Sequence, residues 1–226
     1  MVHILFDRLD FSADFLYQTF RHCLHPGDTV VIPAFSYRDS DVHSLADWNR
    51  LYNPRDGLYY HAMTGPFLRY GIPESQIHWI NAFTDSKARA AELIRNADIL
   101  YLPGGLPDRM LERMDAFDLR DSLLRFQGVM MGYSAGALIQ LEEYHLSPDS
   151  DYPEFSYHPG LPLLKDFYLE VHYQGAPAQD QAIRRVLKER RKKVYATVTD
   201  RSAILIDGSE TKLLGDVRIF TPASSV

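Results

Sequence analysis

The residues best suited to chemistry in this sequence lie in the segment VMMGYSAGALIQL, residues 129–141. An apolar run ends at Ser134, and Gly132 and Gly136 stand on either side of it. This G-x-S-x-G pattern is typical of a nucleophile elbow, a sharp strand-to-helix turn that raises a serine hydroxyl above a sheet edge. The following helix would point its first amides at that place, so the Ala135 N–H is a candidate oxyanion donor. The alternative is an ordinary tight turn of small residues.

A serine hydroxyl is a weak nucleophile unless a neighbouring base takes its proton, so an active elbow needs a histidine. Of the nine histidines, His172 is the best candidate, because it lies near the end of the strand-like run DFYLEVHY. The C-terminal ends of parallel strands share one sheet edge, which would bring His172 close to Ser134. A structural role for His172 is the alternative, and His145 and His158 lie in less defined surroundings.

Other kinds of site find little support in the sequence. No H-E-x-x-H pattern, cysteine pair or regularly spaced acidic loop occurs, so we expect no metal and no other cofactor. The segment LPGGLPDR lacks the Lys-Ser/Thr ending of a phosphate loop, which argues against a nucleotide. The basic run RRVLKERRKK ends a predicted helix that also carries an apolar stripe, which favours a solvated helix face over a nucleic-acid surface.

Length and composition favour one domain spanning residues 1–226, because 46% of the 226 residues are hydrophobic and can form one core. A net charge of -6 without a dominant basic patch predicts a small peptide or amide substrate and no nucleic-acid partner. Cys23 is the only cysteine, so an intrachain disulfide is impossible and a cytoplasmic location is expected. The apolar start is too short for a signal peptide, and no run predicts a membrane contact.

The elements that would position these residues alternate between apolar strand-like runs and segments of helical period. Such alternation predicts an α/β fold with a mostly parallel central sheet covered on both faces. Three late runs, VYATV, AILID and VRIF, are expected to form a closing β meander. The aromatic-rich segment 43–70 is expected to form two helices that pack on the sheet, with a substrate cleft or a homodimer contact as alternatives.

Three segments, LPGGLPDRML, MGYSAGALI and GLPLLKDFYLEVHYQG, resemble in order and spacing the serine peptidase family that includes peptidase E (aspartyl dipeptidase) and cyanophycinase. The resemblance extends from about Val30 to about Gly208. Its most specific part is the S-A-G-A core, followed about forty residues later by a histidine on a strand. The resemblance implies a three-layer α/β/α sandwich similar to class I glutamine amidotransferases, with serine in place of their cysteine.

The resemblance also implies roles for individual residues. Ser134 corresponds to the nucleophile and His172 to the general base. The Gly-Gly turn after the preceding strand corresponds to a second oxyanion donor, the Gly105 N–H, beside that of Ala135. Peptidase E carries its acid in a D-x-P setting, which corresponds to Asp151.

Other acids could take the place of Asp151, since Asp149 stands two residues upstream in DSDYPEF. Alternatively, Asp149, Asp151 and Glu154 simply solvate a loop. The sequence departs from the family where the Gly-Gly turn continues with Leu106 and Pro107 instead of Asn and Thr, so a different substrate recognition is expected. The arginines that could bind a substrate carboxylate are Arg38, Arg109, Arg113 and Arg201, and a surface charge is the equal alternative for each.

Three functional hypotheses follow. We prefer a serine hydrolase that cleaves a short peptide or related amide. An α/β-hydrolase-type esterase uses the same elbow, but its histidine usually lies near the end of the chain. A non-catalytic, ligand-binding descendant of the fold would keep the elbow while the turn at Leu106 and Pro107 blocks the substrate.

Overall fold

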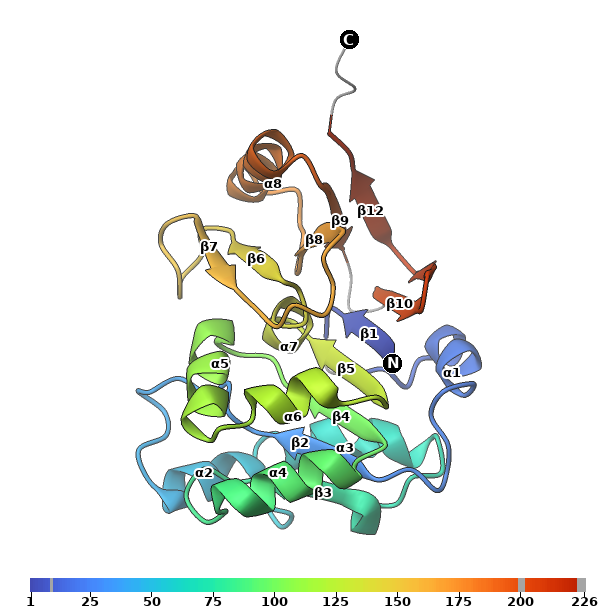
Figure 1. Ribbon diagram of the computed structural model, residues 1–226, viewed down its shortest axis with the longest axis vertical. Coiled ribbons are helices and arrows are strands. Elements are labelled where there is room, and N and C mark those ends of the chain that lie inside the picture. The colour runs from blue at the N-terminus through green and yellow to red at the C-terminus, as the bar shows by residue number, and fades with distance from the viewer. Residues whose placement is uncertain (9, 199–201, 223–226) are drawn as a thin grey trace.

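The computed structural model describes residues 1–8, 10–198 and 202–222 (Figure 1). Within these residues the largest sheet has seven strands. Five strands are mutually parallel, and two antiparallel strands extend the sheet at one edge. In spatial order they are β11 (Glu210–Leu214), β10 (Ala203–Asp207), β1 (Val2–Phe6), β5 (Val129–Tyr133), β4 (Ile99–Leu102), β2 (Val30–Pro33) and β3 (Ile77–Ile80).

Helices cover both faces of this sheet. Strand side chains alternate between two cores, so that Ile4 and Phe6 of β1 enter one core and Leu5 enters the other. The core with Ile4 is completed by α1 (Asp14–Phe20), α2 (Leu45–Tyr52) and α3 (Tyr60–Leu68), and the turn η1 (Glu74–Gln76) leads into β3. The core with Leu5 is completed by α4 (Lys87–Asn96), α5 (Pro107–Ala116), α6 (Arg120–Arg125) and α7 (Ala135–Leu138). The predicted three-layer α/β/α fold is confirmed.

A second, smaller sheet lies above the C-terminal ends of β1 and β5 (Figure 1). Its strands are β8 (Phe167–Glu170), β9 (Lys193–Thr197) and β12 (Val217–Phe220), and α8 (Pro177–Arg190) packs on it through Ile183 and Val186. A separate hairpin is formed by β6 (Glu143–Leu146) and β7 (Ser156–Pro159). None of the described helices is long and apolar enough to cross a membrane.

The three late runs do not form one meander. AILID joins the large sheet as β10 beside β1, whereas VYATV and VRIF pair with each other in the small sheet. The strand that leads to His172 also belongs to the small sheet, where β8 runs parallel to β9. A run of β-forming residues indicates a strand but does not specify its partner, so the sequence pattern could not distinguish these pairings.

Candidate active site

Ser134 occupies a sharp turn between β5 and α7. Its backbone has φ 51° and ψ −117°, a conformation that non-glycine residues rarely adopt. The turn is held at both ends: the Ser134 N–H donates to the carbonyl of Phe6 at 3.1 Å, and the Ser134 carbonyl accepts from the N–H groups of Ala137 and Leu138. The strain is therefore maintained by the surrounding backbone.

The glycines beside Ser134 are required by close backbone contacts. A Cβ atom on Gly132 would lie 2.2 Å from the carbonyl oxygen of Gly136. A Cβ atom on Gly136 would lie 2.0 Å from the carbonyl oxygen of Leu102 at the end of β4. Any side chain at either position would overlap the backbone, which explains why the apolar run ends in such small residues.

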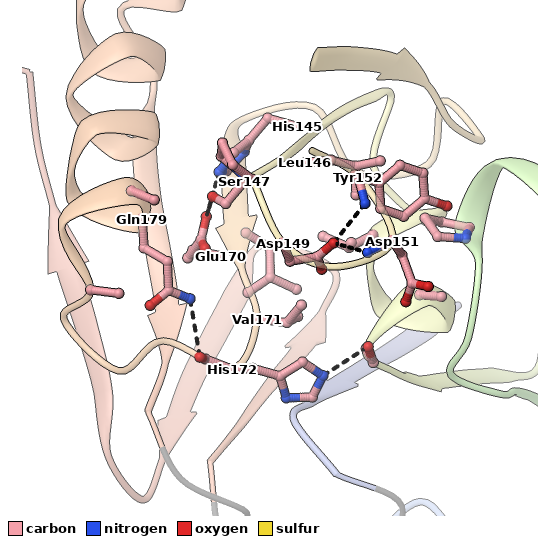
Figure 2. A pocket seen from close by; sticks show the side chains of 18 of the residues that line it. His145, Leu146, Ser147, Asp149, Asp151, Tyr152, Glu170, Val171, His172 and Gln179 are labelled. Atoms are coloured by element: carbon pink, nitrogen blue, oxygen red, sulfur yellow. Dashed lines mark hydrogen bonds and ion pairs between the residues drawn. The ribbon is translucent and has the colours of Figure 1, made fainter. Parts of the chain in front are cut away.

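His172 lies directly beside Ser134, as the sequence predicts. Its Nε2 is 2.9 Å from the Ser134 Oγ (Figure 2). The residue follows β8 with a positive φ of 55°, and its carbonyl accepts a hydrogen bond at 3.1 Å from the Gln179 side chain of α8. The ring thus reaches the large sheet from a loop between the small sheet and α8.

Asp7 is the acid on the far side of the imidazole. Its Oδ2 lies 3.0 Å from the His172 Nδ1, while its Oδ1 accepts the His172 backbone N–H and the Thr197 hydroxyl, each at 2.6 Å. A proton on Nδ1, donated to this carboxylate, leaves Nε2 free to accept from Ser134. Asp7 directly follows β1, whose last residue pairs with the last residue of β5 before Ser134.

Asp7 has only 2% of its surface exposed. Burial alone would raise the pKa of its carboxyl group, but the hydrogen bond and charge of His172, together with the Thr197 hydroxyl and the His172 amide, outweigh that effect. The net result is a pKa below the usual value for aspartate. Asp7 is therefore an anion at neutral pH, held against the imidazole.

Asp151 does not contact the imidazole, and the expectation that it completes the Ser–His pair is corrected by this geometry. Its two carboxylate oxygens instead accept a bidentate pair of hydrogen bonds from Arg38, at 2.9 and 2.5 Å. Asp149 accepts the backbone N–H groups of Asp151 and Tyr152 and shapes the loop. Glu154 is exposed on the same loop.

The turn at Gly105 lies near Ser134, and both residues line the same cavities. Gly105 has φ 136°, and a Cβ atom there would lie 2.2 Å from the carbonyl oxygen of Ser36, so glycine is required. The N–H groups of Gly105 and Ala135 donate to no other described residue. Leu106 and Pro107 begin α5 immediately afterwards, with Pro107 in the first helical turn, where its missing N–H costs nothing.

Two cavities meet at Ser134 and His172. The smaller, of about 500 Å³, extends under the β6–β7 hairpin and α8 (Figure 2). The larger, of about 1020 Å³, extends over α2 and α3, where it is lined by part of the aromatic segment: Leu51, Tyr52, Tyr59 and Met63. Gly105 and Arg38 line both cavities, while Ala135 and Pro107 line the smaller one. A bound molecule could therefore extend to both sides of Ser134.

Most of the candidate carboxylate-binding arginines are already paired. Arg38 is held by Asp151, and Arg109 lies against Asp39 and Glu112. Arg113 donates to Asp39 and to backbone carbonyl groups. Arg201 lies outside the described residues. In the described part of the chain, no group of three His, Cys, Asp or Glu side chains is arranged to hold a metal ion.

The sequence model of peptidase family S51 matches residues 59–214. The chain belongs to this family. The S51 match contains Ser134 and His172 but begins after Asp7, so the acid beside the imidazole is contributed from outside the matched region. The resemblance drawn from the three sequence segments is confirmed at the level of the family. No curated protein sequence matches the chain significantly.

Solved structures share the S51 chain's fold over nearly its whole length. A structure of a putative peptidase E protein from Listeria monocytogenes EGD-e covers 94% of the chain, with 96% of that protein covered, 20% sequence identity and a TM-score of 0.64. A structure of a peptidase from an acI-B1 Actinobacterium covers 100% of the chain, with 96% of that protein covered, 15% identity and a TM-score of 0.65. At these identities the likeness concerns the fold.

Proposed function

We propose that this S51 chain is a serine peptidase that hydrolyses an amide bond of a short peptide, with Ser134, His172 and Asp7 as its catalytic triad. One observation carries the proposal: the Ser134 Oγ, both nitrogens of His172 and the Asp7 carboxylate form one continuous chain of hydrogen bonds of 2.9 and 3.0 Å. Membership of a peptidase family supplies the reaction class. The turn at Ser134 then serves as a nucleophile elbow.

In the first half of the reaction, the Ser134 Oγ attacks the carbonyl carbon of the peptide while its proton passes to the His172 Nε2. The Asp7 carboxylate holds the ring in the required tautomer and stabilises the imidazolium that forms. Collapse of the tetrahedral intermediate breaks the C–N bond, and the leaving amine takes the proton from Nε2. The products of this half are the free amine and an acyl ester on Ser134.

The oxyanion of the intermediate requires donors that are free in the resting protein. The amides of Gly105 and Ala135 meet that requirement, because both residues line the cavity at Ser134 and their N–H groups donate to no described residue. In the second half, a water molecule attacks the acyl ester as His172 takes its proton. Cleavage of the ester bond then returns that proton to Ser134 and releases the carboxylic acid.

The proposal that the turn at Leu106 and Pro107 blocks the substrate finds no support in the geometry. Both residues lead away from Gly105 into α5, and the cavity beside Ser134 remains open with Pro107 as part of its wall. This observation removes the reason that the sequence offered for a non-catalytic, ligand-binding descendant.

The first test is labelling with a fluorophosphonate probe, followed by intact mass. The wild-type protein is expected to gain one probe adduct, Ser134→Ala is expected to gain none, and His172→Ala is expected to label far more slowly than the wild type. Ser75→Ala, a change at an exposed serine that lines neither cavity, serves as the matched control and should label like the wild type. Absence of labelling in a folded wild-type protein would contradict the proposal.

Peptide and ester substrates separate a peptidase from an esterase. A set of dipeptides and their matched dipeptide esters should show hydrolysis of at least one amide bond that is lost in Ser134→Ala. Hydrolysis confined to esters would favour the esterase hypothesis.

A further inference from the structure

The smaller cavity beside Ser134 contains a buried carboxylate that the proposed reaction does not use. Glu170 ends β8 two residues before His172, and only 4% of its surface is exposed. Figure 2 shows it in the cavity wall, between Gln179 of α8 and the loop that carries Asp149. A carboxylate at this depth is costly unless a partner offsets its lost hydration, so its partners are informative.

The hydrogen bonds to Glu170 converge on one oxygen. Its Oε2 accepts from the His145 Nε2 at 2.6 Å and from the Ser147 hydroxyl at 2.7 Å. Two donors on one carboxylate oxygen are the arrangement expected for the ionised form. The other oxygen, Oε1, has no hydrogen-bond partner among the described residues, and Glu170 lines the cavity.

His145 does not offset the charge of Glu170. Its side chain is fully buried, and its Nδ1 has no partner in the described part of the chain. A ring protonated on both nitrogens would leave a buried N–H group without an acceptor. The neutral ring with its proton on Nε2 fits the contacts, so the negative charge of Glu170 remains without a cation beside it.

The rest of the cavity wall is also acidic. Arg38 is the only lysine or arginine among the described lining residues, and both carboxylate oxygens of Asp151 already hold it. Asp149 and Glu170 are thus the carboxylates of the cavity wall that have no lysine or arginine partner, and Glu170 is the buried one of the two. The cavity is therefore an anionic recess that opens directly onto Ser134 and His172.

We propose that this recess binds a cationic group of the substrate, an ammonium or guanidinium, on the free oxygen of Glu170. The inference rests on the proposed peptidase function, because it makes Glu170 a specificity residue of the same site. A cation there would donate a charge-assisted hydrogen bond to that oxygen and would offset the buried charge. The cation is either the α-ammonium group of the peptide or a basic side chain.

Calorimetric binding to the Ser134→Ala variant tests the proposal without turnover. The ligands are Lys-Ala and Ala-Lys, each matched by the dipeptide with norleucine in place of lysine, and the Nα-acetylated form of each. Loss of the recognised cation is expected to weaken affinity at least about tenfold. A loss on acetylation identifies the α-ammonium group, and a loss with norleucine identifies the side chain. Equal affinity across all the ligands, or no binding of any at millimolar concentration, would overturn the proposal.

A variant of the carboxylate sharpens the test. In Ser134→Ala/Glu170→Gln, which keeps the side-chain shape, the preference for the cation should fall to less than about threefold. Ser134→Ala/Glu154→Gln alters an exposed carboxylate on the nearby loop, outside the cavity wall, and should keep the full preference. A preference that persists in the Glu170 variant would refute the role of Glu170. The ligand comparison itself remains decisive if that variant fails to fold.

Failure of this inference is distinguishable from failure of the proposed function. Fluorophosphonate labelling of the wild type reports an activated Ser134 and does not depend on a cation. Labelling without a preference for the cation would remove the inference and leave the peptidase proposal intact. A preference for the cation without labelling would contradict the peptidase proposal and would leave the recess as a binding site for a cationic ligand.

Discussion

The two sheets contribute to the site in different ways. The large sheet supplies Ser134 and Asp7 from the ends of the paired strands β5 and β1, where close backbone contacts fix the chain. The small sheet region supplies His172 from a loop, held by polar contacts to Asp7 and Gln179. A site assembled in this way has one half set by backbone packing and the other by hydrogen bonds, so substitutions in the two halves should have different consequences.

The largest effect is expected in the packed half, from Gly136→Ala. Its Cβ atom would lie 2.0 Å from the Leu102 carbonyl oxygen, so β4 and α7 must separate and the turn at Ser134 must distort. We expect a loss of about 3 kcal/mol or more in the free energy of unfolding, measured with denaturant, and no fluorophosphonate labelling. Gly65→Ala, in α3 with no atom within 4 Å of the new Cβ, is the control and should be neutral or stabilising. Equal behaviour of the two variants would contradict the packing argument.

The next largest effect is expected at the hydrogen bond between Asp7, supplied by the large sheet, and His172, supplied by the small-sheet region. Asp7→Asn preserves the shape of the side chain but favours the wrong imidazole tautomer, so we expect the labelling rate of Ser134 to fall roughly 10³–10⁴-fold. Asp151→Asn, the matched change at the acid paired with Arg38, should change the rate less than about tenfold. The reverse order would restore Asp151 as the acid of the site. Circular dichroism of both variants verifies that each is folded.

The sequence predicts those site residues that belong to a local sequence pattern, and it does not predict those that come together only through strand pairing. The glycines around Ser134 form a local pattern, and His172 follows a recognisable strand, so both could be found. Asp7 is separated from His172 by 165 positions and comes close only because β1 pairs with β5. The one sequence feature that points to Asp7 is its position directly after the first predicted strand, which ends at the same sheet edge as the strand before Ser134.

Contacts between residues distant in sequence also explain where the strand pairing and the partner of Asp151 differ from the prediction. The runs VYATV and AILID have equally strong strand patterns but enter different sheets, because periodicity carries no information about pairing partners. The D-x-P setting taken from the resemblance favours Asp151, yet Arg38, far away in the sequence, pairs with Asp151 instead. The α/β fold with a covered parallel sheet was predictable because it follows from the alternation of strand-like runs and helical segments along the chain.

The stability of the folded protein is expected to depend on pH because Asp7 is held against His172. The pKa of Asp7 is lowered in the folded protein, so its contribution is fully present above the pKa of the unfolded chain and is lost as the pH falls through the lower folded value. Denaturant unfolding from neutral to acid pH should therefore show a smaller acid-induced loss of stability in Asp7→Asn than in the wild type. Parallel curves for the two proteins would contradict the assigned direction of the shift.

The smallest effect is expected at the hydrogen-bonded support of His172. Gln179→Ala removes the donor to the His172 carbonyl and the acceptor of the Gln174 N–H. We expect a labelling rate lowered a few-fold and a loss of about 1 kcal/mol in the free energy of unfolding. Gln127→Ala, at an exposed position remote from both cavities, is the control. An unchanged labelling rate would mean that Asp7 alone positions the ring.

The most direct test of the account is a double-mutant cycle on the labelling rate of Ser134, with His172→Ala, Asp7→Asn and the combination of both. If Asp7 acts through His172, the double variant should label no more slowly than His172→Ala alone, because the acid has no role once the imidazole is gone. Losses that multiply in the double variant, or an Asp7→Asn variant that labels like the wild type, would contradict the triad of Ser134, His172 and Asp7.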